Sequence, residues 1–167
     1  MKNVGKSVPR VDGNEKVTGS SSFVTDVSMP NTLWMKFLRS SVPHARILNL
    51  DVKEALLLPG VHAILTGEDV EGIRGGNLYA DEPILASWDK VRFVGDKIAA
   101  VAGENKDVVE EAIKLIKVQY EELPAVFDPV ESMKHTSPIL HEEFNEYRGV
   151  QTQENASNLY QSVVSGW

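Results

Sequence analysis

Alternating apolar and polar residues predict β-strands along much of the chain. From Thr32 to Arg39, Leu33, Met35 and Phe37 fall on one face of the first strand. The opposite face also carries apolar residues, so we expect both faces to be at least partly covered. Further strands are predicted at residues 45–50, 61–65, 91–94 and 98–102. The last of these is apolar throughout, which is typical of a strand buried at the centre of a sheet.

The longest predicted helix runs from about Lys106 to Lys117. Its apolar residues recur at helical spacing and form one stripe: Val108, Val109, Ala112, Ile113 and Ile116. Glu110 and Lys114 stand four positions apart, so we expect them to pair on the helix surface. At Ile116 the apolar spacing changes to every second residue, which predicts that a strand follows the helix directly.

A second, shorter helix is predicted from Ala55 to Leu58. Asp51 precedes it as a candidate N-cap, and Glu54, three residues later, completes the pattern of a capping box. The pair Pro59-Gly60 ends this helix. One further helical turn is predicted within residues 129–134. The elements together predict an α+β domain of mixed strands with two main helices.

Three segments show no useful period. Residues 1–22 are rich in Gly, Ser, Lys and Val, and we interpret them as an extended arm with turns. Residues 67–83 contain several glycines and are interpreted as a long surface loop, a kind of segment that often carries function. Beyond about residue 145 the sequence is polar and typical of a linker. We therefore predict one domain over residues 1–145, including the arm, and a linker or tail over residues 146–167.

The composition excludes several classes of function. The 167 residues carry a formal net charge of −7 and no cysteine. An acidic protein without a run of basic residues is a poor ligand for nucleic acid or for anionic membranes. The missing cysteines exclude disulfides, thiolate-bound zinc and iron–sulfur clusters within the chain. The N-terminus lacks the apolar segment of a signal peptide, and no apolar stretch could span a bilayer, so we expect a cytoplasmic protein.

The four histidines are weak candidates for a site. His44 lies two residues before Arg46 at the start of a strand, and the pair could hold an anion or be an ordinary hydrogen-bonded surface pair. His62 alternates with apolar neighbours and is interpreted as a partly buried structural residue. His135 and His141 are interpreted as solvated, because no second zinc ligand follows His141 at helical spacing.

Paired carboxylates occur at four places, but neighbouring residues on a strand or helix point apart and do not form a catalytic dyad. They are Asp81-Glu82, Glu110-Glu111, Glu121-Glu122 and Glu142-Glu143. The glycines at positions 72, 75 and 76 match neither a P-loop nor a dinucleotide-binding pattern. Considered alone, the residues therefore indicate no active site.

Several segments resemble the start of the large subunit in the xanthine dehydrogenase/aldehyde oxidase family of molybdenum hydroxylases. Residues 7–19 match the entry segment of that family almost residue for residue. Further matches follow in the order of the family: residues 23–26, Leu38-Arg39-Ser40, Pro43-His44-Ala45-Arg46-Ile47, Leu58-Pro59-Gly60-Val61, Thr66-Gly67-Glu68-Asp69-Val70, residues 81–86, residues 90–95 and residues 120–126. The resemblance extends over roughly residues 7–145, and its strength lies in the order and spacing of the matches.

The resemblance implies the fold called the α/β hammerhead. It also implies a role within an enzyme that hydroxylates heterocycles, aldehydes or related compounds with oxygen from water. Molybdopterin, iron–sulfur clusters and flavin are the cofactors expected in the complete enzyme, and none of them in this chain. The glycine-rich cofactor motif and the catalytic glutamate of the family lie downstream of this domain, so the resemblance carries over no catalytic residue.

One pair of site residues does carry over. In the family, an apolar and an aromatic residue shortly before an Asp-Glu pair help to line the substrate channel, and Leu78 and Tyr79 match them. The alternative is that Tyr79 only packs a long loop against the domain. Departures from the family occur at Ser41-Val42 and at Asp96-Lys97, where many relatives have other residues. These departures put inference about the substrate in doubt, but not inference about the fold.

Two hypotheses for the role of the chain follow. In the first it is the non-catalytic N-terminal domain of a molybdenum hydroxylase, and its partners are downstream molybdopterin-binding domains or a subunit of the same enzyme. In the second it is a stand-alone hammerhead module that binds a partner without redox chemistry. A domain made to sit against larger domains is expected to expose an apolar patch and to self-associate when isolated. Candidates for that patch are Trp34, Leu38 and Trp88.

Overall fold

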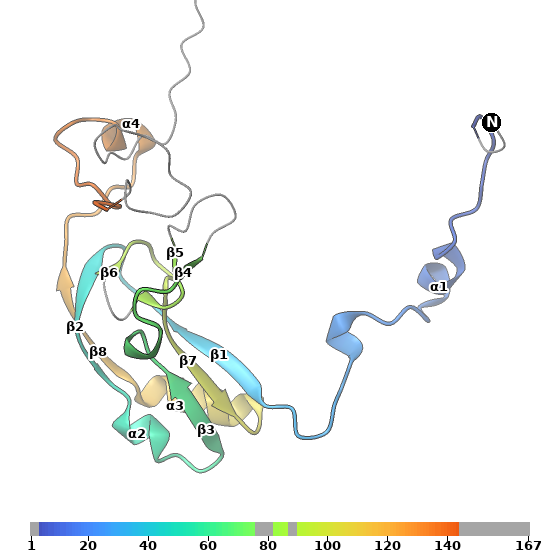
Figure 1. Cartoon of the computed structure of the whole chain (residues 1–167), viewed down its shortest axis with the longest axis horizontal. Helices are drawn as coiled ribbons and strands as arrows, with labels where there is room; N and C mark the ends of the chain where they lie inside the picture. Colours follow the sequence, from blue (N-terminus) through green and yellow to red (C-terminus); the bar gives the residue numbers. More distant parts are fainter. Residues whose placement is uncertain (1–3, 76–81, 87–89, 144–167) are drawn as a thin grey trace, which may run out of the picture. The chain divides into compact units, whose positions relative to one another are not determined.

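The computed structural model describes residues 4–75, 82–86 and 90–143. By its internal contacts the chain divides into two units, Met1–Thr32 and Leu33–Trp167. The second unit contains antiparallel sheets and few helices (Figure 1), in agreement with the predicted mixed α/β class. No helix within the described ranges is long and apolar enough to cross a membrane.

The first unit contains two short helical segments, the α-helix α1 (Gly13–Thr18) and the 3-10 helix η1 (Val24–Asp26). The first of them corrects the expectation of an extended arm with turns only. It begins at a turn in which the N–H of Gly13 donates to the carbonyl of Arg10. It ends at Gly19, whose φ of 72° closes the helix in the left-handed conformation. A six-residue helix with no buried residue produces no apolar period, so the sequence pattern did not predict it.

The first sheet of the second unit has β7 at its centre, as predicted. Its strands, in the order β1-β7-β3, are β1 (Trp34–Arg39), β7 (Lys97–Gly103) and β3 (Val61–Leu65). All pairings are antiparallel, and Gly103 lies opposite both Trp34 and Val61. The side chains of Ile98, Ala99 and Val101 are buried, which explains the continuous apolar run of β7.

The second sheet is built around β2. Its strands, in the order β6-β2-β8, are β6 (Lys90–Val91), β2 (Ala45–Asp51) and β8 (Lys117–Glu122). The pairing of β2 with β8 is irregular between Ile47 and Asn49, and Leu48 at this position is exposed. The predicted strand over residues 91–94 is wrong beyond its first residue, because the chain turns at Gly95, whose φ is 95°.

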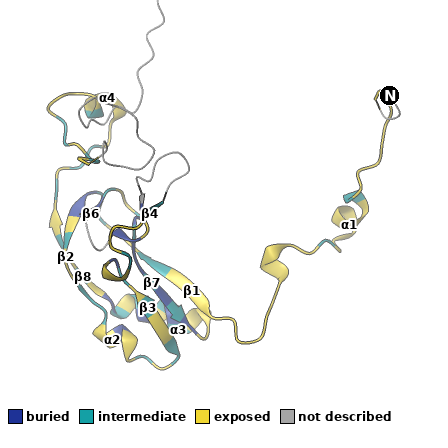
Figure 2. Ribbon diagram, viewed as in Figure 1, coloured by how far each residue is buried: buried dark blue, intermediate teal, exposed yellow. Residues whose placement is uncertain are grey.

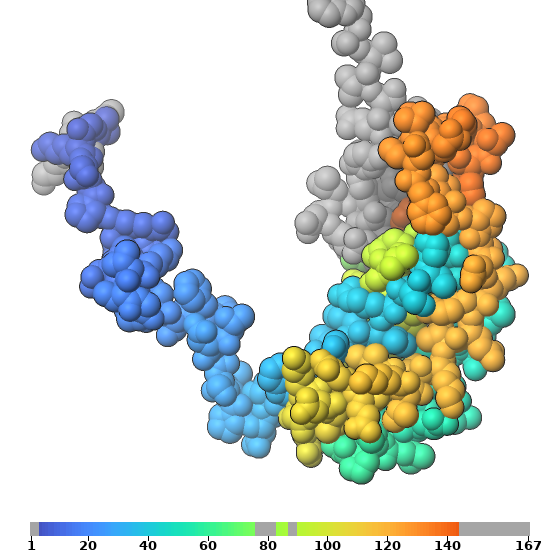
Figure 3. Space-filling view, turned by 180° about the vertical axis from the view of Figure 1, so that it is seen from behind, coloured from blue at the N-terminus to red at the C-terminus, as the bar shows by residue number. Residues whose placement is uncertain are grey.

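The longest described helix, α3 (Lys106–Leu115), contacts the first sheet along β1 and β7 and leads directly into β8, as predicted. Asn105 caps its start, because the side-chain oxygen accepts the N–H of Val108 at 3.0 Å. Val109 and Ala112 on its inner face are buried (Figure 2). Seen from the opposite side, α3 and β8 occupy adjoining parts of the surface (yellow to orange in Figure 3).

The helix α3 and the first sheet lie close together at Gly103, at the end of β7. A Cβ atom at this position would lie 3.0 Å from the carbonyl oxygen of Gly60 and 3.0 Å from Cγ2 of Val109. Real Cβ atoms rarely have contacts this short, so only glycine fits here without displacing its neighbours.

The predicted ion pair between Glu110 and Lys114 is not the one that forms. Instead, Glu110 Oε1 lies 2.9 Å from Lys36 Nζ on β1 and 4.0 Å from Lys106 Nζ. The hydrogen bond from Lys36 lowers the pKa of the Glu110 carboxyl. A contact between two elements far apart in the sequence has taken the place of the local pair.

The predicted capping box at the second helix is also wrong. That helix, α2 (Lys53–Leu56), is a single turn that begins at Lys53. Asp51 Oδ1 does accept the N–H of Lys53 at 3.1 Å, but Glu54 turns away to Lys117 Nζ on β8, at 2.6 Å. The predicted turn near residue 130 is confirmed as α4 (Pro129–Ser132), capped by the side chain of Asp128.

Candidate functional site

The predicted channel residues Leu78 and Tyr79 lie outside the described residues. The chain on either side of them forms two short strands, β4 (Arg74–Gly75) and β5 (Glu82–Pro83), which pair with each other. Arg74 lies opposite Pro83 in this ladder, and the N–H of Ile84 donates to the carbonyl of Ile73 at 3.1 Å. The ends of the segment that contains Leu78 and Tyr79 are therefore held side by side.

Three basic side chains, called the basic cluster below, lie beside this ladder and on or next to β6: Arg74, Lys90 and Arg92. The Arg74 side chain is 12% exposed and the Lys90 side chain is 7% exposed. Lysine and arginine are rarely so deeply buried without a partner, because removing a charge from water is costly. No pattern in the sequence marked any of these three residues as part of a functional site.

Each residue of the basic cluster has a partner in residues 140–143, and Arg92 Nη1 also donates to the carbonyl of Lys90 at 3.3 Å. The three contacts are Arg92 Nε to the Leu140 carbonyl at 3.0 Å, Lys90 Nζ to Glu142 Oε2 at 3.4 Å, and Arg74 Nη2 to Glu143 Oε2 at 3.4 Å. The doublet Glu142-Glu143 thus serves as an anchor and not as a dyad. Contacts between residues 48 and 69 positions apart leave no local signal in the sequence.

Asp96 is the buried carboxylate of this region and is 5% exposed. Its two oxygens accept the N–H groups of Arg92 at 3.1 Å and Lys97 at 2.9 Å. Its backbone is tied to Ser40, whose N–H donates to the Asp96 carbonyl at 2.8 Å. Burial raises the pKa of the Asp96 carboxyl, although these N–H groups oppose the shift. The residue holds the turn between β6 and β7, which gives the departure at Asp96-Lys97 a structural role.

His44 is buried and forms no anion site with Arg46, which is exposed. Its Nδ1 atom lies 2.7 Å from the carbonyl oxygen of Pro124. Because a carbonyl oxygen only accepts, Nδ1 donates in this contact. In the described part of the chain Nε2 is buried without a hydrogen-bond partner. Both predicted interpretations of this pair are therefore wrong, and the ring joins the start of β2 to the segment after β8.

The other histidines lie apart from one another. His62 is exposed and not partly buried as predicted, and its Nε2 is 3.5 Å from Glu104 Oε1. His135 is exposed as predicted, whereas His141 is half-buried. Over the described ranges, no three residues of the types His, Cys, Asp and Glu are grouped so as to hold a metal ion.

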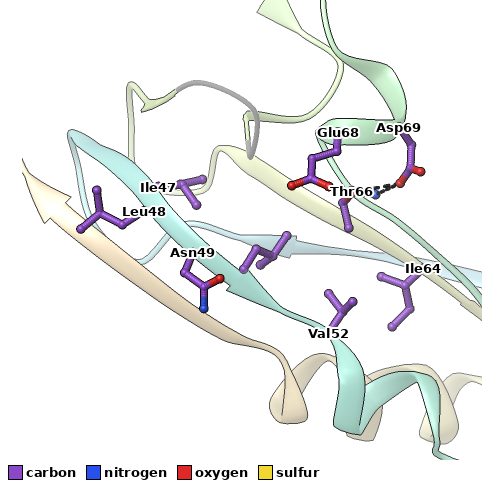
Figure 4. Close-up of a pocket in the computed structure, with 9 residues that line it drawn as sticks. Ile47, Leu48, Asn49, Val52, Ile64, Thr66, Glu68 and Asp69 are labelled. Carbon is purple, nitrogen blue, oxygen red and sulfur yellow. Dashed lines mark hydrogen bonds between the residues drawn. The ribbon is translucent and has the colours of Figure 1, made fainter.

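A hollow of about 410 Å³ opens between β2 and β3 (Figure 4). Its lining combines mostly apolar residues and Asn49 on β2 and β3 with acidic residues at the 3-10 helix η2 (Glu68–Val70): Ile47, Leu48, Asn49, Leu50, Val52, Ile64, Thr66, Glu68 and Asp69. Asp69 is already bound, because its Oδ2 accepts the N–H of Thr66 at 2.7 Å and the hydroxyl of Thr66 at 3.0 Å. These hydrogen bonds lower the pKa of the Asp69 carboxyl. The hollow is large enough for a small molecule but offers no cation to an anionic one.

Of the three residues predicted to form an apolar patch, one is exposed, one packs in the core and one lies outside the described residues. Trp34 is 55% exposed and lines a smaller hollow of about 160 Å³ with its neighbour Met35. Leu38 is not part of such a patch, because it packs against two groups of buried core residues. One group contains Val101 and Val109, and the other contains Ala45 and Ile98. Trp88 lies outside the described residues.

Comparison with known proteins gives a consistent result. Residues 18–124 match the sequence model of a family domain described as "Aldehyde oxidase and xanthine dehydrogenase, a/b hammerhead domain". The chain is 42% identical over 137 residues to a subunit of a probable xanthine dehydrogenase from Bacillus subtilis. It is 41% identical over 143 residues to the nicotinate dehydrogenase large molybdopterin subunit of Eubacterium barkeri.

A solved structure supports the same relationship. The Cu,Mo-CO dehydrogenase in its carbon monoxide-reduced state matches 94% of this chain with a TM-score of 0.77 and 32% sequence identity. The match covers 19% of that chain. The alignments with the two sequence relatives cover 81% and 85% of this chain, but only 18% and 33% of the relatives' own length. The chain thus spans a third or less of the proteins that it resembles.

The names of two of these proteins mention molybdopterin or molybdenum, which raises the question of where such a cofactor could bind. A phosphate-bearing pterin needs cations and N–H donors, whereas the hollow beside η2 presents Glu68 and Asp69. The basic cluster is bound to residues 140–143. The chain has no cysteine for an iron–sulfur cluster. The described residues therefore do not fit any of these groups.

Proposed function

The chain belongs to the aldehyde oxidase and xanthine dehydrogenase family, in which it corresponds to the hammerhead domain of the large subunit. We propose that it works as a non-catalytic part of a molybdenum hydroxylase of this family. It provides scaffold and part of the substrate channel, to which Leu78 and Tyr79 contribute. In the complete enzyme, molybdopterin bound by other domains or subunits would supply the redox chemistry, with iron–sulfur clusters and flavin as the further expected cofactors. The reaction is the hydroxylation of a heterocycle, an aldehyde or a related compound.

The observation that carries this proposal is the β4–β5 ladder. It joins the two ends of the segment 76–81, and Arg74 at its base contacts Glu143. A loop whose ends are fixed on a rigid support can hold side chains toward a neighbouring domain at a defined position. Of the basic cluster, Arg74 connects this support to Glu143.

The proposal includes the organisation of the chain. Residues 1–145 form the hammerhead domain with its N-terminal arm, and residues 146–167 lead toward the molybdopterin-binding domains. The partners are those domains or subunits, and nucleic acid and membranes are not among them. The lack of cysteine supports a reducing, cytoplasmic compartment.

The test is Tyr79→Ala in the complete enzyme. A tyrosine in the channel wall offers an apolar ring with a hydroxyl at its edge. Its removal is expected to change kcat/KM by roughly ten- to two-hundredfold, to different extents for different substrates. The variant Tyr79→Phe separates the contribution of the hydroxyl from that of the ring. The control is Leu57→Ala, which shortens a side chain that is 83% exposed between α2 and β3.

The expected result is a changed order of substrate preference in Tyr79→Ala, with the molybdenum content and thermal stability of the unaltered enzyme. Leu57→Ala should leave the order unchanged. If all substrates keep their relative kcat/KM in Tyr79→Ala, or if that variant loses its fold, Tyr79 is a packing residue and the channel role is wrong.

A further inference from the structure

The first unit has apolar side chains but no core. Within residues 4–32, called the N-terminal arm below, no residue is buried (Figure 2). Its large apolar side chains are all exposed: Val4, Val8, Val11, Val17, Phe23, Val24, Val27 and Met29. Val24 is 91% exposed, although it lies within a regular turn of helix. Apolar side chains at this density on the surface mark a site of interaction.

Local contacts alone determine the backbone of the arm. Among its backbone hydrogen bonds, the longest in sequence runs from the N–H of Ser21 to the carbonyl of Glu15. The turn η1 is closed by its own cap, in which the N–H of Phe23 donates to Asp26 Oδ2 at 2.8 Å. The arm therefore has a defined local shape but does not bury its own apolar side chains.

The charge of the arm distinguishes it from a solvated tail. Residues 4–32 contain three basic residues, Lys6, Arg10 and Lys16, and three acidic residues, Asp12, Glu15 and Asp26, so their net charge is zero. A segment that stays in water is typically rich in charge and poor in apolar residues. In the arm, Asp12 is bound to its neighbours Arg10 and Lys16. The arm therefore presents its eight exposed apolar side chains without a net charge that would favour a charged partner.

We propose that the N-terminal arm binds an apolar surface of the molybdopterin-binding part of the same enzyme, and that Phe23 and Val24 at η1 are its main contacts. This inference rests on the proposed function. The occupant is argued from the size of the relatives, because the chain spans only 18% and 33% of two of them and most of such an enzyme lies outside it. The family domain itself begins at residue 18, so half of the arm lies before it.

Hydrogen exchange measured by mass spectrometry tests the proposal on the complete enzyme and on residues 1–167 alone. Backbone amides that become buried at an interface exchange only when the interface opens. We expect the amides of residues 20–32 to exchange about a hundredfold more slowly in the complete enzyme than in the chain alone. Because the contact is apolar, 1 M NaCl should change this protection by less than about twofold.

The variants Phe23→Asp and Val24→Asp remove the apolar contact but keep the backbone N–H that closes η1. Either variant should reduce the protection by about tenfold or more. The matched control, Ser22→Asp, adds the same charge at an exposed neighbouring position and should keep the protection. Cross-links from Lys16 should lead to the molybdopterin-binding part.

Equal exchange in the two samples would overturn the inference. So would protection that already exists in the chain alone, which would mean that the arm binds its own domain or a second copy. Cross-links only to a different subunit would overturn it as well. Each of these results leaves the channel role untouched, because Tyr79→Ala is measured independently. A protected arm together with unchanged substrate preference would support the arm and reject the channel.

Discussion

The Asp96 carboxylate accepts backbone N–H groups from Arg92 and Lys97 and is almost fully buried. A buried carboxylate in an enzyme family draws attention as a candidate acid or base. The contacts here are to the backbone of the turn, and none of them leads to a hollow with a second titratable group. Asp96 therefore serves the geometry of the turn between β6 and β7.

The raised pKa of Asp96 predicts the sign of a pH effect. Above the ordinary pKa of 3.8 the unfolded chain releases this proton while the folded chain still holds it. The folded state then binds more protons, so the free energy of unfolding falls as the pH rises until the native pKa is passed. Relative to Asp96→Asn, the unaltered chain should therefore lose stability between about pH 4 and the native pKa, and the difference should then level off.

Urea unfolding of the chain across this pH range measures the effect, with Asp69→Asn as the control. The pKa of Asp69 is lowered by its hydrogen bonds to Thr66, so in measurements extended below about pH 4 the unaltered chain should gain stability relative to Asp69→Asn as the pH rises. Above about pH 4 that difference should stay level, in contrast to the difference for Asp96→Asn. If the free energy of unfolding of the unaltered chain instead rises with pH relative to that of Asp96→Asn, the pKa of Asp96 is not raised.

Elements with many residues in one repeating pattern could be predicted from the sequence. The continuous apolar run of β7, the stripe of α3 and the change of period at Ile116 all correspond to real elements. The strand predicted at residues 91–94 overlaps the two-residue strand β6 only at Val91, because the chain turns at Gly95. The helix α1 was missed for a different reason, because an exposed helix has no apolar face.

Contacts between elements left no such pattern. Glu110 pairs with Lys36, and Glu54 with Lys117, across 74 and 63 positions in the sequence. The basic cluster likewise joins residues from separate segments. Spacing along one helix predicts only local pairs, and the fold replaced them with partners from neighbouring strands.

The close approach of β7 to α3 at Gly103 gives a prediction at the scale of elements. Gly103→Ala would place a methyl group 3.0 Å from a carbonyl oxygen and from Val109, so the helix or strand must shift. Overpacking of this kind destabilises by about 1–3 kcal/mol. The control is Gly75→Ala in β4, where the nearest atom to the new methyl group is Ile84 Cδ1 at 3.8 Å and the change should be within about 0.5 kcal/mol.

Chemical denaturation of both variants, with the free energy of unfolding extrapolated to water, tests this prediction. A loss of stability in Gly103→Ala no larger than that in Gly75→Ala would mean that the β7–α3 contact adapts freely. The packing account of that contact would then be wrong.

For the whole molecule, the fold and the family were within reach of the sequence, whereas the site was not. The order of matched segments sufficed for the family, because it depends on many weak matches. Leu78 and Tyr79 were assigned to a substrate channel by the same resemblance, and this assignment is a prediction that Tyr79→Ala tests. The hollow beside η2 and the basic cluster are assembled from distant segments, so no single motif could have indicated them.

The central claim is that this domain belongs to a molybdenum hydroxylase and binds no redox cofactor itself. The most direct measurement is the molybdenum content of an affinity-tagged chain after washing, purified alone and purified together with the molybdopterin-binding part. We expect stoichiometric molybdenum only in the second preparation, and no iron or flavin in the first. Stoichiometric molybdenum in the chain alone would contradict this account. So would a tagged chain that purifies free of molybdenum even when the molybdopterin-binding part is present, as expected of a stand-alone module.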